Sequence, residues 1–259
     1  MHIGVIGERE LVRSYERLLA DGLSEASVRR YRASLSALFG WAVRERIIPG
    51  NPVLATRVPR SSALREEMKP FTEAELEEAW LAWRGYDERL ADVMLFLGWT
   101  GLRWGEARAL VVADLLEVPS PGLLVSRSAP EGVGIKSTKG RHSRRVPLAN
   151  RVLPIVLTWT KLKQPGDLLV TTSRGAQLHR SAVLRTLNWP VTGKGRRIHD
   201  LRHTAACLWL ARGVDAGTVQ QWLGHESIGT TNRYLHFLGS AADLAGLDRL
   251  NKTRGQQTR

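Results

Sequence analysis

Apolar residues recur at intervals of three and four along most of this chain, and that periodicity limits it to a mainly helical fold. One helix of about 22 residues is expected to begin after Ser24 and to end before Pro49. Only residues 111–148 depart from this pattern, because short β-prone runs alternate there with Gly, Pro and Ser. The sequence therefore predicts a mostly α-helical α+β fold with a small antiparallel sheet of three strands, at Val111-Val112, Leu123–Val125 and Arg145–Leu148.

Shifts in composition divide the chain into three parts. Residues 1–58 contain two expected helices, over residues 8–20 and after Ser24, and predict a small helical domain. Residues 59–69 carry several charges and predict a linker. Residues 70–259 predict a larger second domain, with a short amphipathic helix expected over residues 235–250.

The charge balance points to an anionic partner. Lys and Arg number 38 against 25 Asp and Glu, which gives a net charge of +13 and an isoelectric point near 10.8. A phosphate backbone would offset that charge, although an ordinary basic enzyme is the alternative. The single cysteine excludes an internal disulfide, and Cys and His do not cluster at zinc spacing. No apolar run is long enough to cross a membrane and no signal pattern is present, so a cytosolic protein is expected.

Two motifs place arginines where phosphate groups can bind. In T-G-L-R-W-G-E, a Gly turn puts Arg103 near a helix N-terminus, which attracts anions. A structural ion pair between Arg103 and Glu106 is the alternative there. In H-D-L-R-H, His199 and Arg202 share one helix face, and a cation beside an imidazole suits phosphate binding and proton transfer. A solvated surface pair would have the same spacing.

Two further motifs have equally plain alternatives. In L-G-H, a glycine ends one helix and places His225 in a turn, and Tyr234 follows about two turns into the next helix. A tyrosine at that position can equally be a core residue. Several basic residues between positions 136 and 145 indicate a positively charged hairpin, for which a solvated face is the alternative.

Taken together, these motifs resemble the tyrosine recombinase family, also called the phage integrase family. Their order is the order of that family, and the resemblance extends over residues 70–238. It implies the recombinase catalytic fold for residues 70–259 and a reduced core-binding, SAM-like module for residues 1–58. Only two helices are clear in that module, where the family has about four, so either the module is reduced or the chain starts late. The resemblance is to small integrases that lack an arm-binding domain.

The resemblance also implies a role for each matched residue. Tyr234 would attack a DNA phosphodiester and form a 3′-phosphotyrosyl intermediate. Arg103, Arg202 and His225 would bind the non-bridging oxygens, so that neither a metal nor another cofactor is needed. His199 would help to remove the proton of Tyr234.

Three further roles follow from the same match. Lys139 would protonate the leaving 5′-oxygen, with Lys136 as the alternative, because hairpin lengths vary in the family. Glu106 would orient the site without reacting. Contacts with the DNA backbone are expected from basic residues in both domains, namely Arg29, Arg30, Arg32, Lys136, Arg141, Lys194, Arg196 and Arg197.

The implied partner is double-stranded DNA at attachment or core sites. The family assembles as a homotetramer on DNA, so a monomer is expected in free solution, with the C-terminal segment docking on a neighbouring subunit or packing in cis. Integration or excision of a phage or other mobile element, in the cytoplasm at the nucleoid, is the expected role. The alternatives are relaxation of supercoils, as by type IB topoisomerases, and a DNA-binding relative with weak or no catalysis. A Mg²⁺-dependent nuclease is disfavoured because no acidic cluster stands out.

Overall fold

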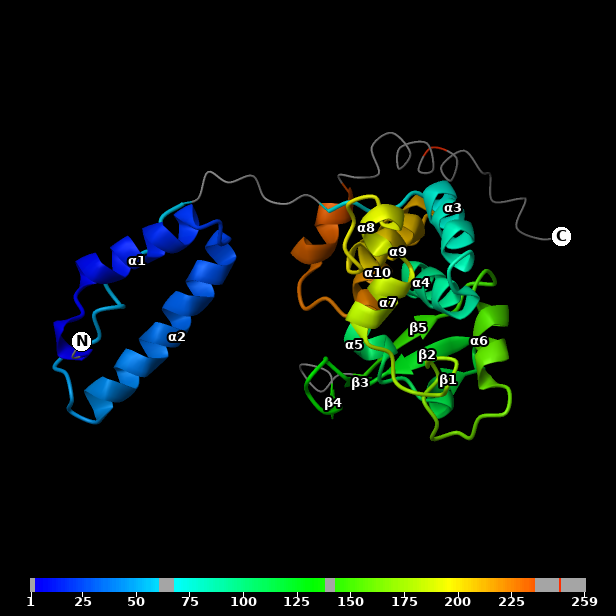
Figure 1. Ribbon diagram of the computed structural model, residues 1–259, viewed down its shortest axis with the longest axis horizontal. Helices are drawn as coiled ribbons and strands as arrows, with labels where there is room; N and C mark the ends of the chain where they lie inside the picture. Colours follow the sequence, from blue (N-terminus) through cyan, green and yellow to red (C-terminus); the bar gives the residue numbers. More distant parts are fainter. Residues whose placement is uncertain (1–2, 61–67, 138–142, 236–246, 248–259) are drawn as a thin grey trace. The chain divides into compact units, whose positions relative to one another are not determined.

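The computed structural model describes residues 3–60, 68–137, 143–235 and 247. The chain divides into two compact units, Met1–Glu67 and Met68–Arg259 (Figure 1), so the division falls inside the expected linker. None of the described helices is both long enough and apolar enough to cross a membrane.

Unit 1 is a pair of helices with its own core. A short 3₁₀ helix, η1 (Ile3–Val5), precedes α1 (Glu8–Ala20) and α2 (Glu25–Arg44). The predicted cap of α2 is present, because the Oγ of Ser24 accepts a hydrogen bond from the N–H of Ser27 at 3.2 Å. The core forms where the apolar faces of the two helices meet the segment that follows them, and it contains Leu11, Tyr15, Val28, Phe39, Ala42, Ile48 and Val53.

Arg32 secures that following segment to α2. Its Nε donates to the backbone oxygen of Thr56 at 3.1 Å, and its Nη2 donates to that of Val53 at 3.1 Å. These carbonyl groups lie outside any helix, so the guanidinium satisfies acceptors that would otherwise need water. Arg32 therefore has a structural role within unit 1, and its contact with DNA stays a prediction.

Unit 2 is built around a helix that is buried along most of its length. All residues of α4 from Val93 to Thr100 are buried, and α4 packs against α3 and α9. The helices of unit 2 are distributed unevenly about its small sheets, because in the view of Figure 1 most lie above the sheets and α6 lies beside them. They are α3 (Glu73–Arg84), α4 (Glu88–Thr100), α5 (Trp104–Ala107), α6 (Leu153–Thr160), α7 (Arg180–Thr186), α8 (Trp189–Thr192), α9 (Asp200–Ala211) and α10 (Ala216–Leu223), with the 3₁₀ helix η2 (Val112–Asp114) and helical residues 228–235.

The predicted antiparallel sheet is present, with one strand shifted. Strands β1 (Leu115–Leu116), β2 (Gly122–Val125) and β5 (Arg144–Pro147) pair in the order β1-β2-β5, and β3 (Arg127–Ser128) pairs with β4 (Lys136–Ser137). The expected strand at Val111-Val112 is wrong, because Val112 begins η2 and Val111 forms only an isolated bridge with Leu168. The carboxylate of Asp114 accepts the N–H of Val111 at 2.9 Å, which curls the chain instead of extending it.

Gly101 turns the chain between α4 and α5. Its φ of 61° lies in the left-handed region, which residues with a side chain rarely adopt. A Cβ at this position would lie 2.9 Å from Leu223, 3.1 Å from Ala205 and 3.2 Å from Trp209. This close approach brings the start of α5, with Arg103, against α9 and the end of α10.

The substitution Gly101→Ala is expected to lower the free energy of unfolding by about 2–4 kcal/mol, from backbone strain and overpacking together. Gly132→Ala is the matched control, because Gly132 also has a positive φ, of 70°, but a Cβ there meets no atom within 4 Å. Urea denaturation followed by tryptophan fluorescence reports on unit 2, where every tryptophan except Trp41 lies. Equal losses in the two variants would contradict the packing argument.

Candidate active site

The carboxylate of Glu106 lies at the centre of a cluster of arginines and is almost completely buried. Arg144 donates to both of its oxygens, from Nη1 at 3.0 Å and from Nη2 at 2.7 Å. Arg103 adds hydrogen bonds from its backbone N–H and from Nη1, each at 2.8 Å. Burial raises the pKa of this carboxyl, but the hydrogen bonds and charge of Arg144, with the charges of Arg103 and Arg202, outweigh it and lower the pKa to about 2. Glu106 therefore holds these guanidinium groups together as an anion.

Arg103 is held by Glu106 and is also accessible to solvent. It is the N-cap residue of α5, and its side chain is 46% exposed although it pairs with the buried Glu106. A hydrogen bond of 2.7 Å from the N–H of Ala129 to the oxygen of Gly105 joins α5 to the chain that follows β3. The structure thus contains the Arg103–Glu106 ion pair that the sequence left as an alternative, and the guanidinium can still meet a ligand.

Arg202 is buried and held by the ends of two helices. Its Nη1 donates to the oxygen of Gly101 at 2.7 Å, and its Nη2 donates to the oxygen of Leu223 at 2.5 Å. Burial first, and then the charge of Arg103, lowers its pKa to about 9, so it stays cationic at neutral pH. Carbonyl groups from the ends of α4 and α10 therefore fix the second arginine of the predicted site next to the first.

His225 follows the glycine that ends α10, as predicted. Gly224 has a φ of 65°, and the Nδ1 of His225 lies 2.9 Å from the Oγ1 of Thr231, which is in the helix of residues 228–235. Burial, followed by the charges of Arg202 and Arg103, lowers the pKa of His225 to about 3. The ring is therefore neutral at neutral pH and can donate from one nitrogen to a phosphate oxygen.

Tyr234 is buried, and its hydroxyl group has a histidine partner. Only 1% of the residue is exposed, and its Oη lies 2.9 Å from the Nδ1 of His203. Its ring stacks on that of His225, with centroids 6.1 Å apart. Burial raises the pKa of Tyr234, although the charge of Arg202 opposes this. The structure thus brings Tyr234 together with His225 and Arg202, as the sequence predicted.

The hydrogen bond to Tyr234 differs from the expectation. The sequence assigned the proton transfer to His199, but the described partner of the hydroxyl group is His203, one turn further along α9. The ring of His199 is exposed and stands edge-on to that of His203, with centroids 4.9 Å apart. Desolvation, followed by the charges of Arg202 and Arg103, lowers the pKa of His199. His199 therefore lies at the rim of the site.

The structure describes only one of the two candidate lysines. Lys136 is exposed on β4, where it pairs with Ser128 on β3. Lys139 and Arg141 lie outside the described residues. Because the chain after β3 is bonded to α5, the basic hairpin begins next to the helix that carries Arg103.

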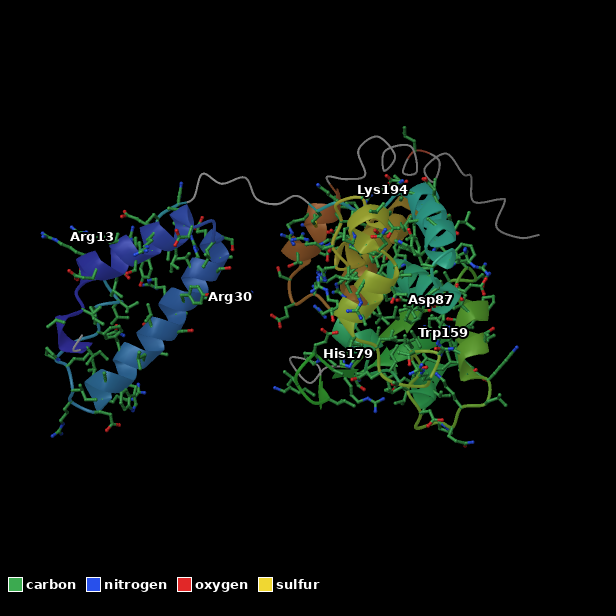
Figure 2. All side chains as sticks on the ribbon, in the orientation of Figure 1. Arg13, Arg30, Asp87, Trp159, His179 and Lys194 are labelled. Atoms are coloured by element: carbon green, nitrogen blue, oxygen red, sulfur yellow. The ribbon has the colours of Figure 1, made fainter. Side chains whose placement is uncertain are left out.

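The other basic residues predicted to contact DNA differ in whether they face solvent or pair with a carboxylate. Arg29 pairs with Glu25 on the same helix, and Arg30 is exposed on α2 (Figure 2). Lys194, also labelled there, is exposed and lies 3.4 Å from Glu78.

Arg196 and Arg197 differ from each other. The guanidinium of Arg196 stacks on the ring of Phe71 at 4.0 Å and pairs with Glu75 at 3.0 Å. With its side chain 11% exposed, Arg196 fastens the segment before α9 to the start of α3, and its contact with DNA stays a prediction. Arg197 is exposed, with its Nε 3.7 Å from Asp200.

Sequence reasoning missed two residues of this site. His203 lies within the quoted H-D-L-R-H motif, four residues after His199, so helical spacing alone would have placed the two on one face. Arg144 belongs to the basic run of the hairpin, and nothing in its sequence context separates it from its neighbours. Its role depends on contacts with Glu106 and with the backbone oxygen of Trp222, which it meets at 2.7 Å.

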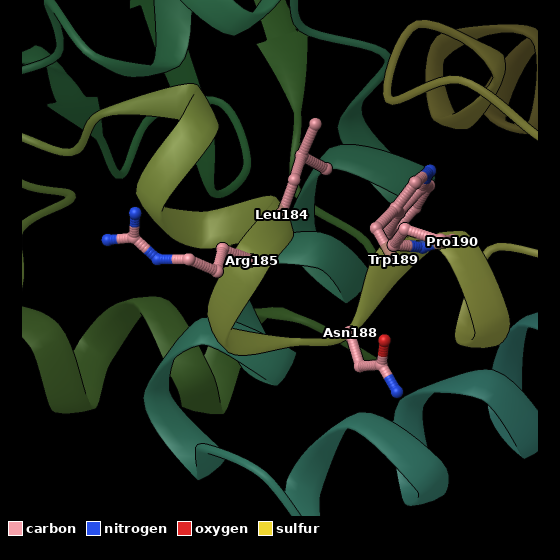
Figure 3. Close-up of a pocket in the computed structure, with 5 residues that line it drawn as sticks. All are labelled: Leu184, Arg185, Asn188, Trp189 and Pro190. Carbon is pink, nitrogen blue, oxygen red and sulfur yellow. The ribbon is translucent and has the colours of Figure 1, made fainter.

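The described residues of this site form no metal cluster, and a pocket described elsewhere in unit 2 is separate from it. A pocket of about 380 Å³ lies at α7 and α8 (Figure 3), and no predicted site residue lines it. Its lining residues are Leu184, Arg185, Asn188, Trp189 and Pro190. The described residues contain no group of three His, Cys, Asp or Glu side chains placed to hold a metal ion. The candidate site is therefore the cluster of cations around Tyr234.

Comparison with known proteins identifies the family. The sequence matches the phage integrase family over residues 70–239. The chain belongs to this family. A tyrosine recombinase of Thermosipho africanus (strain TCF52B) is 30% identical over 241 residues, which are 88% of this chain and 80% of that protein. The expectation of a phage integrase, that is, of a tyrosine-type site-specific recombinase, is confirmed at the level of the family.

Solved integrase structures share the fold. The Tn1549 transposon integrase, in complex with a circular intermediate DNA, superposes with a TM-score of 0.73 at 21% identity, over 96% of this chain and 86% of that one. Lambda integrase, as a tetramer bound to a Holliday junction, gives a TM-score of 0.65 at 20% identity, over 87% and 66%. These likenesses confirm the predicted mostly helical α+β fold of a phage integrase.

Glu106→Gln is expected to destabilise this protein in a pH-dependent way. The folded pKa of about 2 lies below the ordinary value of 4.5 for this carboxyl, so the carboxylate contributes stability above pH 4.5 that is lost as the pH falls toward 2. The difference in unfolding free energy between wild type and variant should therefore shrink by about 2 kcal/mol between pH 6 and pH 3. Urea denaturation at each pH measures this.

The control for that titration is Glu73→Gln. Glu73 forms a pair with Arg212 in which both side chains are about half exposed, and such surface pairs contribute little. The unfolding free energy of the Glu73→Gln variant should stay close to that of the wild type. If the difference in unfolding free energy between the wild type and Glu106→Gln did not change with pH, the role of the buried ion cluster would be contradicted.

Proposed function

We propose that this protein is a site-specific DNA recombinase that cleaves and rejoins strands through a 3′-phosphotyrosyl bond to Tyr234. The observation that carries the proposal is the position of the Tyr234 hydroxyl group, 2.9 Å from a histidine nitrogen and next to two held arginines. A phenol oxygen that can lose its proton beside fixed cations is suited to attack a phosphodiester. Membership of the phage integrase family supports the same chemistry.

Arg103 and Arg202 would stabilise the transition state. A phosphorus atom with five oxygens gathers negative charge on its non-bridging oxygens, and fixed guanidinium groups meet that charge without rearranging. Glu106 and the carbonyl groups around Arg202 hold both side chains before DNA arrives. His225, neutral at neutral pH, would donate a further hydrogen bond to the same oxygens.

A lysine of the basic hairpin would protonate the leaving 5′-oxygen. The bond from phosphorus to that oxygen breaks as the bond to Tyr234 forms, so the number of ester bonds is unchanged and no external energy source is needed. Lys139 remains our preference and Lys136 the alternative. The link between α5 and the chain after β3 places the start of this hairpin beside Arg103 and supports either assignment.

Recombination requires more than one such site, and we propose that this chain works as a homotetramer on DNA. The lambda integrase tetramer bound to a Holliday junction supports this assembly, because it shares the fold. A monomer in free solution follows from the same proposal. The Tn1549 transposon integrase supports a role with a mobile element or phage, acting on attachment or core sites in the bacterial cytoplasm.

Tyr234→Phe is expected to abolish covalent capture of DNA while leaving DNA binding intact, because only the attacking oxygen is removed. The substrate is a pool of nicked duplexes with randomised sequence around the nick, from which the cleaved fragment diffuses away and traps the intermediate. Denaturing gels measure the protein–DNA adduct, and mobility shifts on the same pool measure binding. A wild-type protein that binds the pool but never forms an adduct would contradict the proposal.

A sulphur atom in place of the leaving 5′-oxygen should identify the general acid. A thiolate leaves without a proton, so the variant that lacks the general acid should regain most of its cleavage rate on this substrate. We expect Lys139→Ala to lose about 100-fold or more with oxygen and to recover with sulphur. Lys136→Ala is the matched variant on the same hairpin. Recovery of Lys136→Ala alone would reverse the assignment, and recovery of neither would exclude both lysines.

A further inference from the structure

Arg108 is a buried arginine beside the candidate site that the proposed reaction does not use. It is the C-cap residue of α5, five positions after Arg103, and only 3% of it is exposed. Its Nε donates to the backbone oxygen of Leu178 at 2.6 Å, its Nη2 donates to the Oε1 of Gln177 at 2.9 Å, and its Nη1 donates to the backbone oxygen of Ala129. None of these acceptors is a carboxylate, so these bonds do not make Arg108 one half of an ion pair.

The three acceptors belong to two segments that lie far apart in the sequence. Ala129 comes directly after β3, the first strand of the basic hairpin, whereas Gln177 and Leu178 come shortly before α7. The Nε2 of Gln177 also donates to the backbone oxygen of Arg108 at 3.0 Å. Burial of a charged group costs free energy unless its hydrogen bonds are satisfied, so the guanidinium joins the end of α5 to both segments at once.

The start of the hairpin is also held by the middle of α5. The N–H of Ala129 donates to the backbone oxygen of Gly105 at 2.7 Å, so both backbone polar groups of Ala129 are bonded to α5 and its C-cap. A Cβ on Gly105 would lie 2.7 Å from the Oγ of Ser128 and 3.4 Å from the backbone nitrogen of Pro130. The lack of a side chain at this position therefore lets β3 approach α5 closely.

Glu131 holds the chain two residues further on. Its Oε1 accepts the N–H of Arg180, at the start of α7, and the Nε1–H of Trp104 in α5, the latter at 3.3 Å. The chain that leaves β3 is thus attached at residues 129 and 131 to the same two elements, α5 and the start of α7, that Arg108 joins.

The position of β3 determines that of β4. The two strands pair in an antiparallel way, with Ser128 directly opposite Lys136. Because Ser128 is also the residue that meets Gly105, a movement of β3 away from α5 would displace the strand that carries Lys136 and precedes Lys139. The reach of either lysine therefore depends on how closely the hairpin is held against α5.

We propose that Arg108 is the positioning residue of the general acid, because it holds the basic hairpin against the helix that carries Arg103. This inference rests on the proposed recombinase function, in which a hairpin lysine gives its proton to the 5′-oxygen as the bond from phosphorus to that oxygen breaks. Arg108 acts through the lysine and does not itself touch the reacting atoms. A misplacement of about 1 Å can cost on the order of 100-fold in rate.

Arg108→Lys keeps the positive charge but lacks the flat fork that reaches three acceptors. We expect single-turnover cleavage of the nicked pool to fall by about 10- to 100-fold. Most of this loss should disappear on a pool with sulphur in place of the leaving 5′-oxygen, since a thiolate leaves without a proton. Denaturing gels measure the adduct on both pools, and mobility shifts should show unchanged DNA binding.

Arg89→Lys is the matched control. Arg89, on α4, also binds the segment before α7, because its Nε donates to the backbone oxygen of Thr171 at 2.7 Å and its Nη2 donates to the Oγ1 of Thr171 at 2.8 Å. These bonds do not involve the basic hairpin. Any loss of cleavage in Arg89→Lys should therefore be the same with oxygen and with sulphur.

Gly105→Ala disturbs the same contact and leaves Arg108 in place. The added methyl group would press on Ser128 and force β3 away from α5. We expect the pattern of Arg108→Lys, namely a loss with oxygen that sulphur largely restores. Melting temperatures show which variants fold, and Gly105→Ala supplies the test if Arg108→Lys does not fold.

Amide hydrogen exchange examines the same contact without DNA. The N–H of Ala129 should exchange faster in Arg108→Lys than in the wild type, whereas exchange in α9 should be unchanged. In the folded variants, unchanged exchange at Ala129, unchanged cleavage, or a loss of equal size with oxygen and with sulphur overturns the inference. A wild-type protein that binds the pool but never forms the adduct instead overturns the proposed function.

Discussion

The buried carboxylate of Glu106 is the interaction on which the rest of the site depends. It receives both terminal nitrogens of Arg144 and two N–H groups of Arg103, so it ties β5 to the start of α5. Arg144 also reaches the backbone oxygen of Trp222 near the end of α10, which ties in the turn that carries His225. Removal of one partner from such a buried pair leaves an uncompensated charge and commonly costs about 3–5 kcal/mol. Cations that are already held in place can meet the charge of a phosphate at little further cost.

Tyr234, the proposed nucleophile, is buried and held by contacts with two histidines. With 1% of Tyr234 exposed, its oxygen must become more accessible before it can reach phosphorus. The helix of residues 228–235 is attached by the contact of Thr231 with His225 and by that of Tyr234 with His203. Because His225 follows the turn at the end of α10, the groups that would bind phosphate also restrain the helix of the nucleophile. If the proposed function holds, phosphate binding and the exposure of Tyr234 would involve the same side chains.

The sequence predicted the elements that carry the candidate site better than the contacts within it. Helical spacing and turn residues indicated where these elements begin and end, and the family resemblance grouped Arg202, His225 and Tyr234. They could not predict that His203 would meet Tyr234, since that contact depends on how two separate helices pack. Nor could they separate a guanidinium that faces solvent from one that binds a carbonyl group, and this is why Arg32 was expected on DNA. The first strand was misplaced at residues 111–112 because a single carboxylate hydrogen bond overrode β propensity.

The account requires that DNA becomes attached to Tyr234 and to no other residue. Mass spectrometry of the trapped adduct, after digestion with trypsin and nuclease, measures this directly. Trypsin cleaves after Arg233, so the modified peptide would begin at Tyr234, its only tyrosine. We expect a phosphonucleotide mass on that tyrosine. A nucleotide on any other residue of the wild-type protein would contradict it.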